Sequence, residues 1–266
     1  MKRALKWGLI GSAILLFGGA GLFVYDEPAA GMYVCPGCYG FEAVGSRLYA
    51  DRAMDADAIL TFDADLGEGL ARVESFFGQT RSDPYVFVCS SEACNARMDY
   101  RGSKAKAFGS SFILVFAQGR SAEFLAHELS HIELHHRIGL RRGFSGAIPA
   151  WFDEGLATVI SRDSRFVGVG PGGEPTCIAE PDGPLPTHFR EWGKVAGKKD
   201  RPVYAMAACA VIRWMKENGG RQGVLDTIDR VAQGEVIVNP PPSKHPPPCH
   251  TTHTSPLHKN THHPFD

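Results

Sequence analysis

Apolar residues recur at near-helical spacing over several stretches of the chain, which predicts that most of its elements are helices. Residues 41–80 form the first stretch, and we expect it to be largely helical and amphipathic. Its apolar positions are Ala43, Val44, Leu48, Ala58, Ile59, Leu66, Leu70, Val73 and Phe76. Caps and breakers predict further helices over residues 121–139, from residue 149 onward, over residues 202–219 and over residues 221–232.

Two short runs of β-branched and aromatic residues predict strands over residues 84–89 and 111–116. Four basic residues between these strands are expected on a solvated connection, with contact to a substrate as the alternative: Arg97, Arg101, Lys104 and Lys106. Residues 163–200 are rich in Gly and Pro and predict a long loop, a candidate wall for a binding cleft. Together the elements predict an α+β fold that is mostly helical, with a small mixed sheet.

The first 25 residues have the charge pattern of a membrane-targeting segment. Basic residues at positions 2, 3 and 6 precede an uncharged apolar run, Trp7–Tyr25, and acidic residues follow it. That run is long enough to span a bilayer as a helix, and the charge asymmetry places the rest of the chain outside the cytoplasm. We expect a single N-terminal membrane anchor. A cleaved signal peptide, which would release a secreted protein, is the alternative.

The composition changes again near the C-terminus, so the folded domain is expected over residues 26–238. Residues 239–266 are rich in Pro and His and hold too few apolar residues to form a core, which predicts a disordered tail. The alternative is that the tail sequesters metal through its histidines. These are His245, His250, His253, His258, His262 and His263.

Charge and cysteine content narrow the class of protein. The formal net charge is −1 over 266 residues, which gives no indication of nucleic-acid binding. The chain has 7 cysteines, and outside the cytoplasm such residues are typically paired in disulfides. The expected pairs are Cys35–Cys38, Cys89–Cys94 and Cys177–Cys209, which leave Cys249 over. A thiol–disulfide protein that works through Cys35 and Cys38 is an alternative function.

The candidate chemistry centres on residues 127–131, which read H-E-x-x-H. Residues four apart share one face of a helix, so the imidazoles of His127 and His131 can converge on one metal ion. Glu128 is turned about 100° from His127 around the helix and can reach a water molecule instead of the metal. This pattern predicts a zinc site with a general base beside it.

A third ligand is expected from the helix that begins near Pro149. Glu154 would project from the first turns of that helix, and Gly155 beside it allows a close backbone approach. Two His and one Glu leave a fourth position open for water, and that set is typical of catalytic zinc. His135 is expected to face solvent or support a ligand, because a fourth protein ligand would close the site. Asp153 lies on the wrong helix face to bind the metal directly.

The segments H-E-L-S-H and W-F-D-E-G-L-A resemble the gluzincin clan of metallopeptidases, especially the "peptidase MA-like" domains. The resemblance covers residues 110–220 and implies a zincin-like fold and peptidase activity. It implies His127, His131 and Glu154 as zinc ligands and Glu128 as the general base. It also implies that Tyr204 donates a hydrogen bond to the oxyanion.

The resemblance further implies that an upper strand, expected at residues 112–116, borders the cleft and pairs with an extended substrate. Thr158 replaces an aspartate that often supports a ligand in the clan. The G-x-M-E-N segment of the aminopeptidases is absent, which favours an endopeptidase acting on peptides or proteins. A non-catalytic metal-binding protein of the cell envelope is the alternative.

Overall fold

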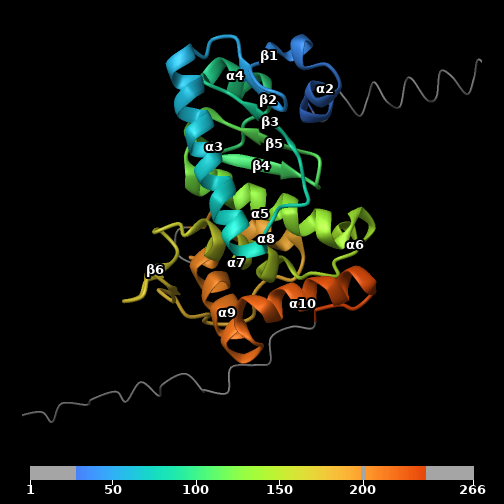
Figure 1. Cartoon of the computed structure of the whole chain (residues 1–266), viewed down its shortest axis with the longest axis vertical. Helices are drawn as coiled ribbons and strands as arrows, with labels where there is room; N and C mark the ends of the chain where they lie inside the picture. The colour runs from blue at the N-terminus through green and yellow to red at the C-terminus, as the bar shows by residue number, and fades with distance from the viewer. Residues whose placement is uncertain (1–27, 199–201, 238–266) are drawn as a thin grey trace, which may run out of the picture.

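Five short strands form a mixed sheet in the upper half of the molecule (Figure 1). The computed structural model describes residues 28–198 and 202–237. The strands are β1 (Phe41–Ala43), β2 (Leu48–Asp51), β3 (Tyr85–Val88), β4 (Ala105–Phe108) and β5 (Phe112–Val115). Their order is β1-β2-β3-β5-β4; the three inner strands are parallel and the two outer strands antiparallel to their neighbours. β4 is therefore an edge strand.

Alternating side chains of the inner strands enter two separate hydrophobic cores, as the pleat of a sheet requires. Val86 and Ile113 face the larger core, which includes α3 (Ala56–Phe77) and α5 (Ala122–Ile138). Phe87 and Leu114 face the smaller core, which α2 (Pro28–Val34) and α4 (Glu92–Arg97) cover. Both faces of the sheet are thus buried, which explains the continuous apolar runs of β3 and β5.

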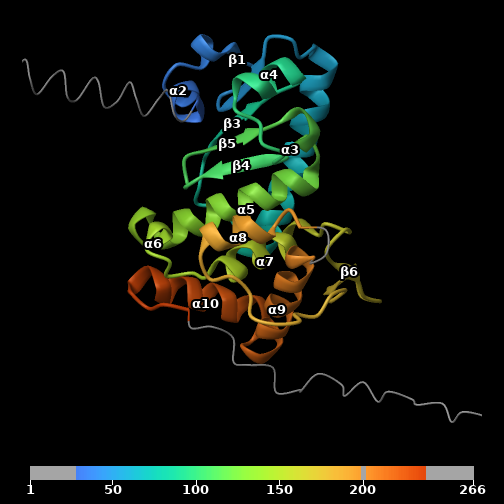
Figure 2. The same ribbon diagram turned by 180° about the vertical axis from the view of Figure 1, so that it is seen from behind.

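The helix α5 lies between the sheet above it and a group of helices below it (Figure 2). Its neighbour α7 (Ala150–Ser161) is buried along its whole length and packs against α5 and α9 (Val203–Glu217). α10 (Gly220–Gln233) packs against α5 and α9. The shorter elements are η1 (Pro36–Tyr39), η2 (Ala117–Gly119), α6 (Leu140–Phe144), β6 (Gly168–Val169), β7 (Pro175–Thr176) and α8 (Phe189–Val195).

This mixed, mostly helical architecture agrees with the fold class expected from the sequence. The segments predicted as an N-terminal anchor and a disordered tail lie outside the described residues. Within residues 28–198 and 202–237, no helix is both long and apolar enough to cross a membrane.

The prediction of a largely helical region over residues 41–80 is wrong for its first part. Residues 41–51 form the hairpin of β1 and β2, and the helix α3 begins only at Ala56, with Asp55 as its N-cap. The spacing of Ala43, Val44 and Leu48 imitates a helical period. The backbone turns between them, however, and the N–H groups of residues 44 and 45 both donate to the Leu48 carbonyl.

Two other segments were only partly anticipated. Residues 104–108, expected on a solvated connection, include the edge strand β4. Residues 163–198 are mainly a loop as expected, with the short hairpin β6–β7 and the helix α8 added. The three expected disulfides are present, and Cys177–Cys209 fastens this loop to α9.

Gly155 lies where α7 crosses α9, and the crossing leaves no room for a side chain. A Cβ atom at Gly155 would lie 2.5 Å from the Ala207 carbonyl oxygen and 2.9 Å from the Val211 Cγ2 atom. By contrast, a Cβ atom at Gly67 in α3 would meet nothing within 4 Å, and this glycine is exposed. The absence of a side chain at Gly155 thus brings the helix that carries Glu154 close to α9.

We expect Gly155→Ala to lower the free energy of unfolding by about 1–3 kcal/mol, because the added methyl group forces the two helices apart. Gly67→Ala is the matched control and should raise it by about 0.5–1 kcal/mol, the usual gain for Gly→Ala in a helix. Urea unfolding followed by circular dichroism measures both. Equal effects of the two substitutions would contradict a close crossing at Gly155.

Glu133 of α5 forms a network of hydrogen bonds with the segment between α3 and β3. Its carboxylate accepts hydrogen bonds from the Arg81 and Ser82 backbone N–H groups, from the Ser82 hydroxyl at 2.6 Å and from Arg137 Nε at 2.6 Å. Burial raises the pKa of Glu133, but these donors outweigh burial and hold the pKa below its usual range.

A carboxylate with a lowered pKa in the folded state stabilises the fold above its unfolded pKa, and this contribution is lost as the pH falls through the folded pKa. We therefore expect Glu133→Gln to lose stability at pH 7 and to show a shallower decline in unfolding free energy below pH ~4.5 than the parent. Glu68→Gln, at an exposed pair with Arg72, is the control and should keep the parental slope. Identical slopes for Glu133→Gln and the parent would exclude this linkage.

Candidate metal centre

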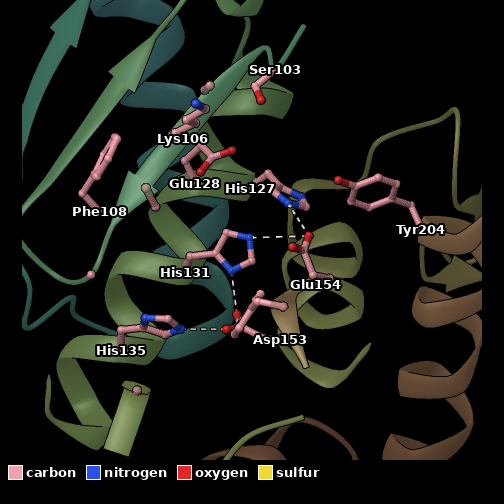
Figure 3. A pocket seen from close by; sticks show the side chains of 15 residues that line it. Ser103, Lys106, Phe108, His127, Glu128, His131, His135, Asp153, Glu154 and Tyr204 are labelled. Atoms are coloured by element: carbon pink, nitrogen blue, oxygen red, sulfur yellow. Dashed lines mark hydrogen bonds and ion pairs between the residues drawn. The ribbon is translucent and has the colours of Figure 1, made fainter. Parts of the chain in front are cut away.

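A cleft of about 430 Å³ opens between the edge strand β4 and the helices beneath it (Figure 3). Residues 103–109, which include β4, line one wall. The helices α5 and α7 supply the polar residues opposite, and Tyr204 from the first turn of α9 stands at one end. Gly143 of α6 and Phe189 of α8 also line it. The volume is in the range of small-molecule and active-site pockets.

Three side chains converge in this cleft in the arrangement expected of metal ligands. One nitrogen each of His127 and His131 and one carboxylate oxygen of Glu154 lie within 4.8 Å of one another. Glu154 Oε2 is 3.4 Å from His127 Nε2 and 3.8 Å from His131 Nε2. In a tetrahedral zinc site with bonds of about 2.0–2.1 Å, ligand atoms lie about 3.4 Å apart. The donor types and their spacing therefore fit zinc.

Helical geometry explains how each ligand reaches this point. His127 and His131 are one turn apart on α5, and their rings lie 4.8 Å apart at an angle of 80°. Glu154 comes from the second turn of α7, which crosses beneath α5. Because α7 is buried throughout and packed closely at Gly155, the carboxylate is held against the two imidazoles.

Asp153 binds two histidines of α5 at once. Its Oδ1 atom is 2.6 Å from His131 Nδ1, and its Oδ2 atom is 2.7 Å from His135 Nε2 (Figure 3). The Asp153 carboxylate is 1% exposed, so both histidines act as its partners in place of water. Because Nδ1 of His131 is engaged by Asp153, its Nε2 atom faces the cleft, which is the orientation that a metal ligand requires.

The same contacts determine the pKa values of Asp153 and His131. Burial raises the pKa of Asp153, but His131 and His135 outweigh burial and hold the pKa well below its usual range. Burial lowers the pKa of His131, but the carboxylates of Asp153, Glu154 and Glu128 raise it by more. The negative charge of Asp153 is thus retained beside the site and strengthens His131 as an electron donor.

Glu128 lies on the other side of the ligands, toward β4 (Figure 3). Burial raises the pKa of its carboxyl group, and the charge of Glu154 raises it further. His127, His131 and a hydrogen bond from the Ala107 backbone N–H act in the opposite direction. A half-buried carboxyl group with a raised pKa is suited to accepting and releasing a proton.

Tyr204 is held beside His127 by aromatic packing. Its ring stacks on Phe166 with centroids 5.2 Å apart, meets Trp192 edge-on at 5.1 Å and lies 6.1 Å from the His127 ring. Burial, followed by the charge of Glu154, raises the pKa of the Tyr204 phenol. The phenol therefore keeps its proton and remains a hydrogen-bond donor at neutral pH. Phe166 and Trp192 come from the long loop and α8.

The structure brings together all five residues expected at the site: His127, Glu128, His131, Glu154 and Tyr204. His135 is not among the converging ligands and instead supports Asp153. The hydroxyl of Thr158 donates to the Glu154 backbone carbonyl at 2.7 Å, so it does not support a histidine. The expectation that the strand at residues 112–116 borders the cleft is wrong, because β5 is covered by β4. β4 takes that place.

Sequence reasoning missed two features of the cleft. It did not anticipate that Asp153 would bridge two histidines, although the i, i+4 series His127, His131 and His135 was a possible signal. It also missed β4, whose small and polar residues do not form an apolar run.

Two further groups of potential ligands occur in the described part of the chain, and both include disulfide-bonded cysteines. They are Asp51 with Cys89 and Cys94, and Glu180 with Cys177 and Cys209. A sulfur in a disulfide is not a thiolate and does not act as a strong zinc ligand. Of these three groups, only His127, His131 and Glu154 therefore consist entirely of side chains that can bind zinc.

Searches against models of protein families, against curated proteins and against solved structures found no match to this chain.

We expect Asp153→Asn to weaken zinc binding roughly 10- to 100-fold, because the neutral amide no longer stabilises His131 as a ligand. His135→Gln should weaken it in the same direction by freeing one Asp153 oxygen. His136→Gln, at the exposed neighbouring position, is the matched control and should leave the affinity unchanged. Competition with a chromophoric chelator measures all three, and equal affinities would show that Asp153 does not position a ligand.

Proposed function

We propose that this protein is a zinc metallopeptidase of the gluzincin type that hydrolyses peptide bonds. The observation that carries the proposal is the placement of Glu128. Its half-buried carboxyl group lies in the same cleft as His127, His131 and Glu154, beside the two histidines and toward β4. A site that only stores metal has no need of a further carboxyl group at that position.

The residues fit a resident zinc ion, which His127, His131 and Glu154 would hold. The Asp153 bridge supports this assignment, because it turns the second nitrogen of His131 toward the other two donors. When bound, zinc supplies Lewis acidity that makes water a nucleophile near neutral pH and polarises a carbonyl group.

The chain's own residues supply the proton transfers and the orientation. Glu128 takes a proton from the attacking water and delivers it to the amine that leaves, so one water molecule is consumed for each peptide bond broken. The raised pKa of Glu128 favours this exchange. Tyr204 donates its phenolic hydrogen to the oxygen of the carbonyl under attack, where negative charge develops.

We further propose an endopeptidase that is attached to a membrane by residues 1–25, with its catalytic domain outside the cytoplasm. The three disulfides support an oxidising compartment. A secreted form, released by cleavage of the same segment, is the alternative. The substrates are peptides or proteins that reach the cell envelope.

Two alternative functions predict different experimental results. A non-catalytic metal-binding protein would retain zinc but show no hydrolysis that depends on Glu128. A thiol–disulfide protein would depend on Cys35 and Cys38, which are bonded to each other at the start of η1 and do not line the cleft. Its activity would persist in the presence of a zinc chelator.

We expect Glu128→Gln to keep its zinc and to lose at least 100-fold in turnover, because the amide cannot accept the proton from water. The assay is cleavage of a peptide library followed by mass spectrometry, with zinc content measured on the same samples. Glu123→Gln, the same change in the first turn of α5, is the control and should retain turnover. Full turnover by Glu128→Gln would exclude Glu128 as the base.

A further inference from the structure

No strand in the described part of the chain pairs with the outer edge of β4, and residues of β4 line the cleft. The Lys104 carbonyl accepts from the Phe116 N–H at 3.0 Å, so the backbone groups of Lys104 point toward β5. In an antiparallel pair the direction of the backbone groups alternates from residue to residue. The backbone groups of Lys106 and Phe108 therefore also point toward β5, and the backbone groups of Ala105 and Ala107 point away from it. The hydrogen bond from the Ala107 N–H to Glu128 agrees with this direction.

The side chains of β4 alternate between two very different surfaces. Ala105 and Ala107 face the larger core, on the side of α5, and offer only methyl groups there. Lys106 and Phe108 lie on the opposite face, and both also border the cleft. Phe108 stacks on Phe112 with ring centroids 4.5 Å apart, which fixes an aromatic surface next to Lys106.

We propose that β4 selects extended peptide segments that carry an apolar side chain and, two residues later, an acidic side chain. This proposal rests on the peptidase function proposed above and names the substrate class of the same cleft. We place the peptide antiparallel to β4, so that its residue opposite Phe108 precedes its residue opposite Lys106. Residues directly opposite on one face make side-chain pairs.

The surroundings of Lys106 favour an acidic partner. Within the described part of the chain, Lys106 forms no ion pair with another side chain. Its Nζ atom lies 5.9 Å from the centre of the Phe116 ring. The carboxylate of Asp99 forms its ion pair with Arg101, at 2.6 Å from Nη2 and 2.7 Å from Nε, and the charge of Lys106 acts on it more weakly. A substrate carboxylate opposite Lys106 would therefore supply a direct counter-charge.

Binding at this edge also affects the proposed base. The peptide residue opposite Ala107 would accept the Ala107 N–H, which Glu128 accepts in the free protein. Displacement by the peptide would leave the Glu128 carboxylate available to a water molecule. Pairing along β4 thus links the presence of an extended substrate to the availability of Glu128.

The test measures how fast the full-length protein cleaves two series of peptides. One series has the sequence apolar-x-Glu and the other apolar-x-Lys, with uncharged residues elsewhere. We expect the parent to cleave the Glu series with a kcat/KM roughly two- to fivefold higher, the size of one cross-strand ion pair. Lys106→Met should abolish this preference and Lys106→Glu should reverse it. Lys104→Glu makes the same charge change outside the cleft lining and should keep the parental preference.

Two results would overturn the proposal and can be told apart from failure of the peptidase function. If the parent cleaves peptides but Lys106→Glu keeps the preference for Glu, then Lys106 does not pair with the acidic side chain of the substrate. If Lys104→Glu reverses the preference as fully as Lys106→Glu, the cause is the general field and not a cross-strand pair. If neither series, nor any peptide in a random library, is cleaved in a Glu128-dependent manner, the peptidase function itself fails.

Discussion

A buried carboxylate shared by two histidines is the interaction on which the cleft depends. Asp153 belongs to α7, and its two partners, His131 and His135, belong to α5, so the bridge fixes one helix against the other. It also sets the ring of His131 with Nε2 toward Glu154. Because Asp153 and Glu154 are adjacent, the contact that orients one ligand also places the next one.

The layers of the fold build the cleft around this contact. The sheet covers α5 from above, and α7 and α10 pack against it from below (Figure 1). An antiparallel edge strand then lies along one side of the ligands, so the proposed base, Glu128, has the three ligands on one side and the backbone of β4 on the other. The proposed catalytic centre and the proposed peptide-binding strand thus belong to neighbouring elements.

The local part of the site could be predicted from the sequence, because it depends on helix periodicity. The spacing of His127 and His131 places both on one face of α5, and an acidic residue on a second helix completes the group. The bridge made by Asp153 could not be predicted in the same way. It depends on the angle at which α7 crosses α5, and no short-range pattern encodes that angle.

The sheet shows the same division between local and tertiary information. β3 and β5 are buried on both faces, and their apolar runs made them visible in the sequence. Among the described strands β4 pairs with β5 alone, and its residues alternate between methyl groups and longer side chains, which hid it among basic residues. The hairpin of β1 and β2 was misread because apolar residues on either side of a turn imitated a helical repeat.

Zinc stoichiometry of the folded domain, residues 28–237, compared with its His127→Ala variant provides the most direct test of the metal centre. Removing the C-terminal segment excludes its histidines as an alternative source of bound metal. We predict about one zinc ion per chain in the parent and a large loss in the variant, because two donors remain where three are needed. Equal zinc content in both proteins, or none in either, would contradict a zinc centre formed by His127, His131 and Glu154.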